Sequence, residues 1–429
     1  MKTPVPLSRR KVPPELIAAV RGPVVVLMGS PSEVGNLLEQ LKLPDALCLQ
    51  LDLHQARMLK ADLEARGVTA RVEVVKDFWD MHHGQATLLT FSQMGGEREL
   101  KIDLVDQGFH SISPGGRIVV WCPTVDDSLF PGLLKRFFGK THAHTRRQDL
   151  VLWAVRQDGV DRPRRRHELN FHARVGQNPS QNFICRPGVF SYGKMDDGSR
   201  ALAEIARVEP GDRVLDLGCG HGTLGVFAGI TTGPKGHIVF TDSNARALGL
   251  AELNAHAAGL TNFTTVLAAD NADLEPLGAN SFDVVLANPP YFAAGSIAVR
   301  FVEQAANMLK PGGRFYLVTR QPDAAGEVMA TLFPTFDAIM NRGYTVLLVD
   351  KQMELRPIPM DESALEQGEE IEDPIEEIVG SDEIIPKRGT RGTRFRKRDN
   401  RKGIGMKSRS PRPTRRDGTS HDRPLKGDE

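Results

Sequence analysis

The sequence has few of the features that mark secreted, membrane-spanning or metal-binding proteins. Its four cysteines, at positions 48, 122, 185 and 219, include no CxxC pair and no zinc-site spacing, which predicts a reducing compartment. No apolar run approaches the roughly twenty residues of a transmembrane helix, and no apolar N-terminal segment resembles a signal peptide. Neighbouring histidines, such as those at 82 and 83, have no companion ligands at convincing spacing. We therefore expect a cytoplasmic protein that binds no metal and does not enter a membrane.

Charge is nearly balanced over the whole chain, but it is divided into blocks near the C-terminus. At 429 residues, two domains and a tail are expected, and the net charge is +1. Residues 361–383 contain acidic residues and no basic ones, whereas residues 387–416 are rich in arginine and lysine. Such segments cannot bury enough apolar surface to fold, so we predict a disordered tail over 351–429. Its basic block either binds RNA or, with the acidic block, only keeps the chain soluble.

A loop after the apolar run 282–287 carries the most specific chemical signal. The run predicts a buried parallel strand, and the two prolines that follow it make the loop stiff. The asparagine side-chain oxygen and the first proline carbonyl are two acceptors beside a flat tyrosine ring. This arrangement suits a planar amino group and resembles that of methyltransferases acting on planar nitrogen. The candidate catalytic residues are Asn288, Pro289, Pro290 and Tyr291.

A glycine-rich turn follows the strand predicted at 213–217. Gly218, Gly220 and Gly222 tolerate positive φ, and the helix expected from about residue 223 offers free N–H groups to a nucleotide-type ligand. Gly220, Gly222 and Gly225 also match the GxGxxG pattern of dinucleotide-binding enzymes. Asp216 favours S-adenosylmethionine instead, because a carboxylate there would repel a pyrophosphate and attract a methionine ammonium or its ordered waters.

Acidic residues also end the next two predicted strands. Asp242 is expected to accept the ribose hydroxyls, and Asp270 the adenine amino group, with Asn271 in the same cofactor site. Either carboxylate alone would be read as an ordinary turn residue. Their positions at the ends of successive strands favour a nucleotide site.

Four motifs in order carry a family resemblance. They are Pro-Gly-Val-Phe-Ser at 187–191, Asp-Gly-Ser at 197–199, Asp-Leu-Gly-Cys-Gly-His-Gly at 216–222 and Asn-Pro-Pro-Tyr at 288–291. Residues from about 183 to 349 are similar to the bacterial ribosomal RNA guanine-N2 methyltransferases of the small subunit and to their large-subunit relatives. The resemblance implies a class I S-adenosylmethionine-dependent enzyme in which Phe190 and the segment 196–199, with Asp197 and Ser199 as cofactor-binding residues, close over the cofactor. It also implies cofactor contacts from Gly218, Asp242 and Asp270.

One departure from that family concerns the acceptor. The family typically has Asn-Pro-Pro-Phe-His, whereas this chain has Asn-Pro-Pro-Tyr-Phe. Tyrosine also occurs in relatives that methylate adenine N6 or glutamine amides, so these acceptors stay open as alternatives. A non-catalytic RNA-binding protein on the same fold would predict decay of Asp216 or Asn288, and neither has decayed.

The two halves of the chain contain a repeat. Residues 113–121 echo residues 310–318, and the same register aligns 25–29 with 214–218, 91–94 with the Asn288 loop, and Asp52 with Asp242. Leu27 then replaces the first aspartate, and Ser30 and Pro31 interrupt the glycine turn. We therefore predict an α/β protein with two tandem Rossmann-like, doubly wound methyltransferase domains, the first degenerate and the second catalytic.

The predicted organisation is a degenerate domain at 1–158, a basic linker at 159–182, a catalytic domain at 183–350 and the tail at 351–429. The cluster at 161–167 either follows an RNA backbone or is a solvated loop, and the first domain either docks RNA, supports the second domain, or does both. The predicted reaction is transfer of a methyl group from S-adenosylmethionine to guanine N2 in ribosomal RNA, as free RNA or in a ribosomal subunit.

Overall fold

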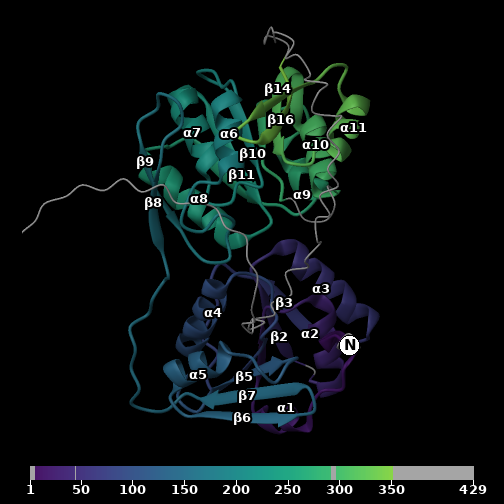
Figure 1. Cartoon of the computed structure of the whole chain (residues 1–429), viewed down its shortest axis with the longest axis vertical. Coiled ribbons are helices and arrows are strands. Elements are labelled where there is room, and N and C mark those ends of the chain that lie inside the picture. Colours follow the sequence, from purple (N-terminus) through teal and green to yellow (C-terminus); the bar gives the residue numbers. More distant parts are fainter. Residues whose placement is uncertain (1–4, 44, 291–295, 351–429) are drawn as a thin grey trace, which may run out of the picture. The chain divides into compact units, whose positions relative to one another are not determined.

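Two seven-stranded sheets form the framework of the computed structural model, which describes residues 5–43, 45–290 and 296–350 (Figure 1). Their strand orders are β3-β2-β1-β4-β5-β7-β6 and β12-β11-β10-β13-β14-β16-β15, so the second sheet repeats the first. In each sheet the first four strand pairings are parallel and the last two are antiparallel. This repetition confirms the predicted pair of Rossmann-like α/β folds. We call the part built on the first sheet, within residues 5–158, the first lobe, and the part within residues 169–350 the second lobe.

The first lobe is a sheet buried on both faces. Val25 and Leu27 of its central strand enter one hydrophobic cluster, while Val24 and Val26 enter another, as expected for a parallel strand covered on both sides. Its elements are η1 (Leu7–Arg9), α1 (Pro14–Ala19), β1 (Val24–Leu27), α2 (Pro31–Leu41), β2 (Ala46–Gln50), α3 (Leu53–Ala65), β3 (Ala70–Val74), β4 (Thr87–Phe91), α4 (Arg98–Ser111), β5 (Arg117–Cys122), α5 (Phe130–Phe138), β6 (Thr141–Arg146) and β7 (Asp149–Val155).

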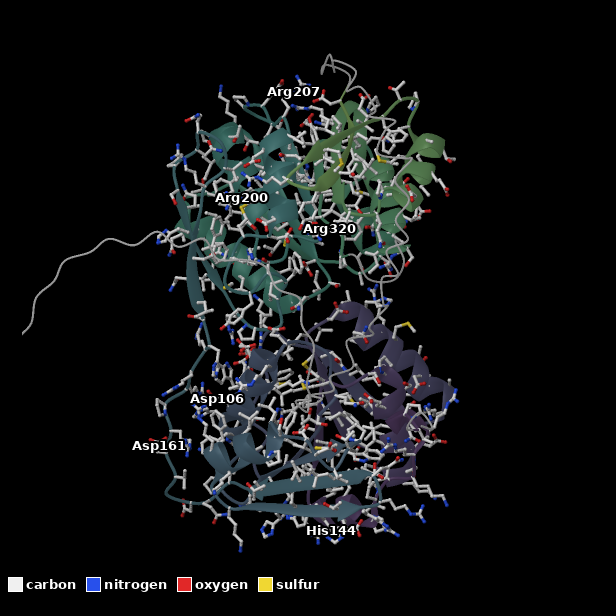
Figure 2. The ribbon with its side chains drawn as sticks, viewed as in Figure 1. Asp106, His144, Asp161, Arg200, Arg207 and Arg320 are labelled. Atoms are coloured by element: carbon white, nitrogen blue, oxygen red, sulfur yellow. The ribbon has the colours of Figure 1, made fainter. Side chains whose placement is uncertain are left out.

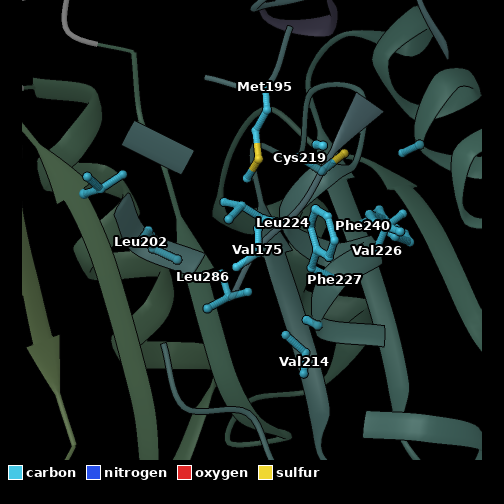
Figure 3. Close-up of a cluster of buried hydrophobic side chains, with 14 of the residues drawn as sticks. Val175, Met195, Leu202, Val214, Cys219, Leu224, Val226, Phe227, Phe240 and Leu286 are labelled. Atoms are coloured by element: carbon cyan, nitrogen blue, oxygen red, sulfur yellow. The ribbon is translucent and has the colours of Figure 1, made fainter. Parts of the chain in front are cut away.

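The second lobe follows the same rule and adds a hairpin. Val214 packs on one face of its sheet and Leu215 on the other; Figure 3 shows the first of these clusters, in which Phe227 and Phe240 join helix to sheet. Its elements are β8 (Leu169–Ala173), β9 (Gln181–Cys185), α6 (Asp197–Ile205), β10 (Arg213–Leu217), α7 (Thr223–Thr232), η2 (Gly233–Lys235), β11 (His237–Asp242), α8 (Ala245–Ala257), β12 (Phe263–Leu267), α9 (Asn271–Leu274), η3 (Glu275–Leu277), β13 (Phe282–Ala287), α10 (Ser296–Met308), β14 (Leu309–Thr319), α11 (Asp323–Leu332), β15 (Asp337–Asn341) and β16 (Tyr344–Val349).

The basic segment between the sheets lies against the first lobe. The guanidinium groups of Arg162 and Arg164 lie over the rings of Phe137 and Trp79, at 5.9 and 5.6 Å from the ring centres. His167 bonds through Nε2 to Oδ2 of Asp106 on α4 at 2.9 Å; Figure 2 labels Asp106, and Asp161 at the start of the segment. The predicted linker also contains β8, which pairs with β9. The boundaries at 158, 182 and 350 stay predictions, and the predicted tail lies outside the described residues.

The structure corrects the predicted alignment of Asp52 with Asp242. Strand β2 ends at Gln50, so Asp52 is the N-cap of α3, and strand β11 ends at Asp242, so Asn244 is the N-cap of α8. Asp52 and Asn244 face each other in an antiparallel bridge between the lobes. Asp52 is therefore the counterpart of Asn244, and the first lobe has Gln50 where the second has Asp242. Counting from the repeat alone misses this shift of two positions because β11 and the connection before it are each one residue longer than β2 and the connection before it.

Candidate active site

The glycine turn after β10 has the backbone that the sequence predicts. Gly218, Gly220 and Gly222 have φ of 72°, 56° and 84°, a region that other residues rarely adopt. A Cβ at Gly218 would lie 2.9 Å from the ring of Phe301, and one at Gly222 would lie 2.9 Å from Ala251. The turn leads directly into the N-terminus of α7, where backbone N–H groups are available to a ligand.

Asp216 forms a hydrogen bond with the first turn of α7, the helix that follows the glycine turn. Its side chain is buried, and its Oδ2 accepts the N–H of Gly225 at 2.7 Å. Among the described residues, Oδ1 of Asp216 has no hydrogen-bond partner. Burial raises the pKa of Asp216 to about 7. The structure therefore joins Asp216 to α7 and leaves one buried oxygen as an unused acceptor; Asp216 itself is not among the residues that line the pocket.

Asp242 joins the glycine turn to the next loop. Its Oδ2 accepts the N–H of Gly220 at 2.8 Å, and its Oδ1 accepts the N–H of Asn244 at 2.9 Å. Burial raises the pKa of this carboxyl to about 6. Each oxygen keeps a further lone pair, so the carboxylate can still accept hydroxyl groups.

Asn288 is held by the start of α6. Its Nδ2 donates to Oδ2 of Asp196 at 2.9 Å and to Oγ of Ser199 at 2.8 Å. Asp196 is the N-cap of α6, and the same Oδ2 accepts the N–H of Ser199 at 2.8 Å. Because an ionised carboxylate only accepts hydrogen bonds, the NH₂ of Asn288 must face Asp196 and its amide oxygen must face away from α6.

A pocket brings the turn, this asparagine and the loop before α6 together. Phe190, one of its lining residues, is 55% exposed, and Pro289 is buried. Pro290 is half-buried, and the predicted stacking residue Tyr291 lies outside the described residues. The pocket is lined by Phe190, Ser191, Asp196, Ser199, Gly218, Cys219, Gly220, His221, Thr223, Leu224 and Asn288.

Three predicted cofactor residues lie elsewhere. Asp197 is the first residue of α6 and is exposed, and it is Asp196 that lines the pocket. Asn271 is exposed at the start of α9. Asp270 is the N-cap of α9, and its Oδ2 accepts a hydrogen bond from Arg57 of the first lobe at 2.6 Å. A contact with a residue more than two hundred positions away leaves no local signal in the sequence.

Two residues of the glycine motif, His221 and Cys219, line the pocket and are themselves buried. His221 is buried edge-on against Phe171 of the hairpin, and burial lowers its pKa to about 4, so its ring is neutral near pH 7. Burial also raises the pKa of the Cys219 thiol, which suits a small filler of the turn rather than a nucleophile. Sequence reasoning missed His221 because a histidine inside a glycine motif carries no mark of burial.

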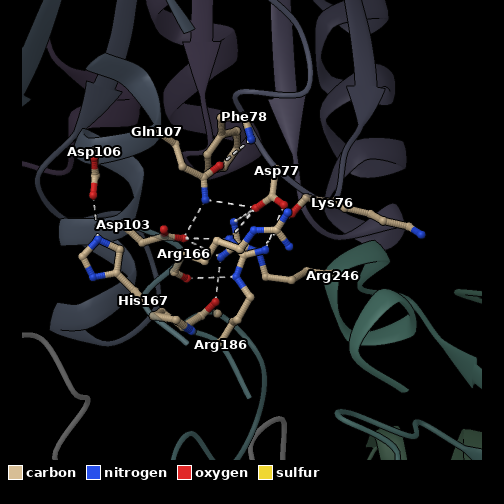
Figure 4. A network of polar contacts seen from close by, with 12 residues as sticks. Lys76, Asp77, Phe78, Asp103, Asp106, Gln107, Arg166, His167, Arg186 and Arg246 are labelled. Atoms are coloured by element: carbon tan, nitrogen blue, oxygen red, sulfur yellow. Dashed lines mark hydrogen bonds and ion pairs between the residues drawn. The ribbon is translucent and has the colours of Figure 1, made fainter. Parts of the chain in front are cut away.

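A larger cavity of about 360 Å³ lies where the two lobes meet. Two of the arginines that line it form hydrogen bonds and ion pairs within the protein. Arg246 donates to Asp103 at 2.8 Å and to Asp77 at 3.1 Å, and Arg186 donates to both oxygens of Asp77 at 2.8 and 2.6 Å (Figure 4). Further donors reach the backbone carbonyls of Lys76, Arg166 and Pro187. The cavity is therefore bordered by an interlobe charge network, and the chemistry that the motifs predict belongs to the smaller pocket.

The described residues contain neither a membrane-spanning helix nor a metal-binding cluster. Within 5–43, 45–290 and 296–350, no helix is both long and apolar enough to span a bilayer. In those same ranges, no three His, Cys, Asp or Glu side chains gather closely enough to hold a metal ion.

Comparisons with known proteins agree with this geometry. Residues 180–348 match the family model described as methyltransferase small domain. The chain is 34% identical over 140 residues to ribosomal RNA small subunit methyltransferase C of Chromohalobacter salexigens, covering 31% of this chain and 40% of that protein. It is also 34% identical over 161 residues to ribosomal RNA large subunit methyltransferase G of Pseudomonas putida, covering 36% and 42%. The chain thus spans less than half the length of these two relatives.

A solved structure extends the likeness to both lobes. The 16S rRNA N2 methyltransferase of T. thermophilus, in complex with AdoMet and guanosine, superposes with a TM-score of 0.64 and 21% identity, over 81% of this chain and 91% of that one. At this identity the match concerns the fold, and it covers the tandem arrangement that the repeat predicted. Together the comparisons confirm the family resemblance drawn from the four motifs.

Proposed function

We propose that this chain, whose residues 180–348 form a methyltransferase small domain, transfers a methyl group from S-adenosylmethionine to the exocyclic N2 of a guanine in ribosomal RNA. One observation carries the proposal: the amide of Asn288 is oriented by Asp196 and Ser199 in a pocket shared with the glycine turn. A ribosomal substrate implies a cytoplasmic location.

The residues present fit S-adenosylmethionine. The glycine turn has no room for side chains at Gly218 and Gly222, and Asp216 retains an unused buried oxygen behind it. We assign cofactor binding to Phe190, Ser199, Asp216, Gly218, Gly220, Gly222 and Asp242. Asp197, Asp270 and Asn271, which do not line the pocket, stay predicted further contacts on the loops next to it. When bound, S-adenosylmethionine supplies an electrophilic methyl group on a sulfonium.

The chain's part in the reaction is to orient the acceptor. The Asn288 amide oxygen and the Pro289 carbonyl accept the two hydrogens of the guanine amino group, which favours a more pyramidal nitrogen with an available lone pair. The gain comes from positioning and from preorganised dipoles, and no covalent enzyme intermediate is needed. A guanine in folded RNA must leave its stack to reach the loop, where Tyr291 is assigned to stack on it.

Three features support guanine N2 in RNA over the other planar amino groups. They are the Pro-Gly-Val-Phe-Ser and Asp-Gly-Ser motifs, the duplicated fold, and the names of the relatives, which are ribosomal RNA methyltransferases. Adenine N6 and glutamine amides are the second candidates, because the loop continues Tyr-Phe rather than Phe-His. Backbone contacts with RNA are assigned to the basic segment before β8 and to the basic block of the tail.

A transfer assay tests this proposal. The full chain is incubated with methyl-labelled S-adenosylmethionine and ribosomal subunits from cells that lack the activity, and the label is counted separately in RNA and in protein. We expect label in RNA with the wild type and none with Asn288→Ala, although that variant still binds the cofactor. Label in ribosomal protein, or equal transfer by Asn288→Ala, would contradict the proposal.

A further inference from the structure

We propose that the first lobe is a working part of the second lobe's cofactor site, because its residues Asp52, Arg57 and Glu97 each hold a different loop of that site. The inference rests on the proposed binding of S-adenosylmethionine and gives the degenerate copy a role in cofactor affinity.

The first contact fixes the loop that follows Asp242. Ser243 donates its hydroxyl to Oδ2 of Asp52 at 2.5 Å, and its carbonyl accepts the N–H of Leu53 at 2.7 Å. In return, the N–H of Ala245 donates to the carbonyl of Leu51 at 2.9 Å. The N-terminal turns of two equivalent helices, α3 and α8, are thus bonded reciprocally, one residue away from the carboxylate assigned to the ribose.

The second contact fixes the acidic start of α9. Arg57 donates to Oδ2 of Asp270 at 2.6 Å and to both oxygens of Asp273 at 2.9 and 2.6 Å. These two carboxylates cap one another's backbone within α9, so their like charges lie close together. A guanidinium between them removes that repulsion and keeps the loop in one conformation.

The third contact fixes the loop that carries Phe190 and Ser191 into the pocket. Oε1 of Glu97 accepts the N–H of Gly188 at 2.5 Å. Gly188 has φ of 82°, and a Cβ there would lie 2.9 Å from Leu100 and 3.3 Å from Leu51. The first lobe therefore packs directly against this backbone, whose positive φ favours glycine.

In the described part of the first lobe, the positions equivalent to the second lobe's glycine turn and Asp242 have different surroundings. Where the second lobe has a glycine turn over an aspartate, Gly29 lies over Phe91, whose ring would be 2.7 Å from an added Cβ. Gln50 fills the position of Asp242 and donates to the carbonyl of Gly29 at 3.3 Å. The contacts of Asp52, Arg57 and Glu97 instead preorganise the neighbouring site, which lowers the ordering cost of binding.

Calorimetric titration of the full chain with S-adenosylmethionine tests the inference. We expect Arg57→Ala and Glu97→Ala to raise Kd about five- to tenfold, the loss associated with one charge-assisted contact. Glu97→Gln keeps the Oε1 acceptor and should bind within about twofold of the wild type. Lys76→Ala, which breaks an exposed interlobe pair with Glu252 at 3.9 Å, is the matched control and should not change Kd.

The outcomes separate the possible failures. Wild-type Kd in Arg57→Ala and Glu97→Ala would overturn the role of the first lobe and leave the proposed function intact. Equal weakening by Lys76→Ala would also overturn it, because loosening of the lobes would then be sufficient. Absence of binding by the wild type would refute the proposed function and this inference together. Thermal unfolding of each variant, measured in parallel, identifies any variant that does not fold. If Arg57→Ala does not fold, the comparison of Kd between Glu97→Gln and Glu97→Ala tests the inference.

Discussion

The side-chain NH₂ of Asn288 lies 2.9 Å from Oδ2 of Asp196, and that same oxygen accepts the N–H of Ser199 at 2.8 Å. One carboxylate oxygen thus begins helix α6 and orients the amide at the end of β13. The N-terminus of a helix and the chemistry of the pocket therefore depend on a single acceptor, which makes Asp196 a positioning residue for Asn288.

Asp196→Ser separates these two tasks. Serine is a good N-cap, so α6 is kept, but its shorter side chain does not reach Asn288. We expect kcat to fall about tenfold or more, equivalent to about 1.4 kcal/mol of transition-state stabilisation, with little change in KM for the methyl donor. Single-turnover kinetics measures both quantities.

Asp196→Asn is the matched control for that variant. Asparagine also caps helices and retains one oxygen that can accept both hydrogen bonds. It should restore most of the rate that serine loses. Wild-type turnover by Asp196→Ser, or equal loss in both variants, would contradict the positioning role.

The burial of Asp216 predicts a pH dependence of cofactor binding. Its pKa is raised from 3.8 to about 7, so the group favours folding most below its ordinary pKa, and this contribution is lost as pH rises through 7. Ionisation over the same range should strengthen attraction for the ammonium of S-adenosylmethionine, which stays charged below its own pKa of about 7.7 to 8.0. We expect Kd to fall about five- to tenfold between about pH 5.5 and about pH 7.5.

Asp216→Asn provides the comparison, because Asp242 titrates nearby with a pKa of about 6. The variant keeps Asp242 and removes only the deeper carboxyl, so most of the pH dependence should disappear. Titration calorimetry at each pH measures this, and an unchanged slope in Asp216→Asn would assign the dependence to another group.

Close packing at Gly225 predicts a loss of stability on adding one methyl group. A Cβ there would lie 2.2 Å from the ring of Phe240 and 2.9 Å from Oδ2 of Asp216. We expect Gly225→Ala to lower the free energy of unfolding by about 1 to 3 kcal/mol. Gly326→Ala, in α11 with only Phe336 at 4.0 Å, should raise it by about 0.5 to 1 kcal/mol. Urea unfolding compares the two, and a neutral Gly225→Ala would show that α7 moves freely.

The buried charge network predicts a strong dependence on Arg246. This side chain is 1% exposed and bonds to Asp103, which is 0% exposed. Arg246→Met leaves that carboxylate without its nearest cation, so the free energy of unfolding should fall by about 3 to 5 kcal/mol. Arg66→Met, which breaks partly exposed pairs with Asp62 and Glu39 at the end of α3, should cost less than about 1 kcal/mol. Equal losses in chemical denaturation would contradict this view of the network.

Features with a local cause were predictable from the sequence. The glycine turn follows from residues that alone tolerate positive φ, and the tandem fold follows from a repeat of apolar strands and turns. The choice between Asp196 and Asp197 was not predictable, because both suit the start of a helix and only packing decides which one caps it. The shift of Asp52 from Asp242 to Asn244 depends on one extra residue in β11 and one in the connection before it.

Contacts between the lobes could not be predicted from local sequence patterns. Arg57 reaches Asp270 and Asp273, and Glu97 reaches Gly188, across long stretches of chain. Only tertiary packing brings such pairs together. Asp270 is predicted from the sequence to bind adenine, but in the structure it is hydrogen-bonded to Arg57 of the first lobe.

Nucleoside mass spectrometry after methylation tests the central claim most directly. Ribosomal subunits lacking the modification are treated with the full chain and S-adenosylmethionine, and their RNA is digested to nucleosides. The proposed function predicts a gain of N2-methylguanosine that depends on Asn288. A gain of N6-methyladenosine, or no methylated nucleoside at all, would contradict it.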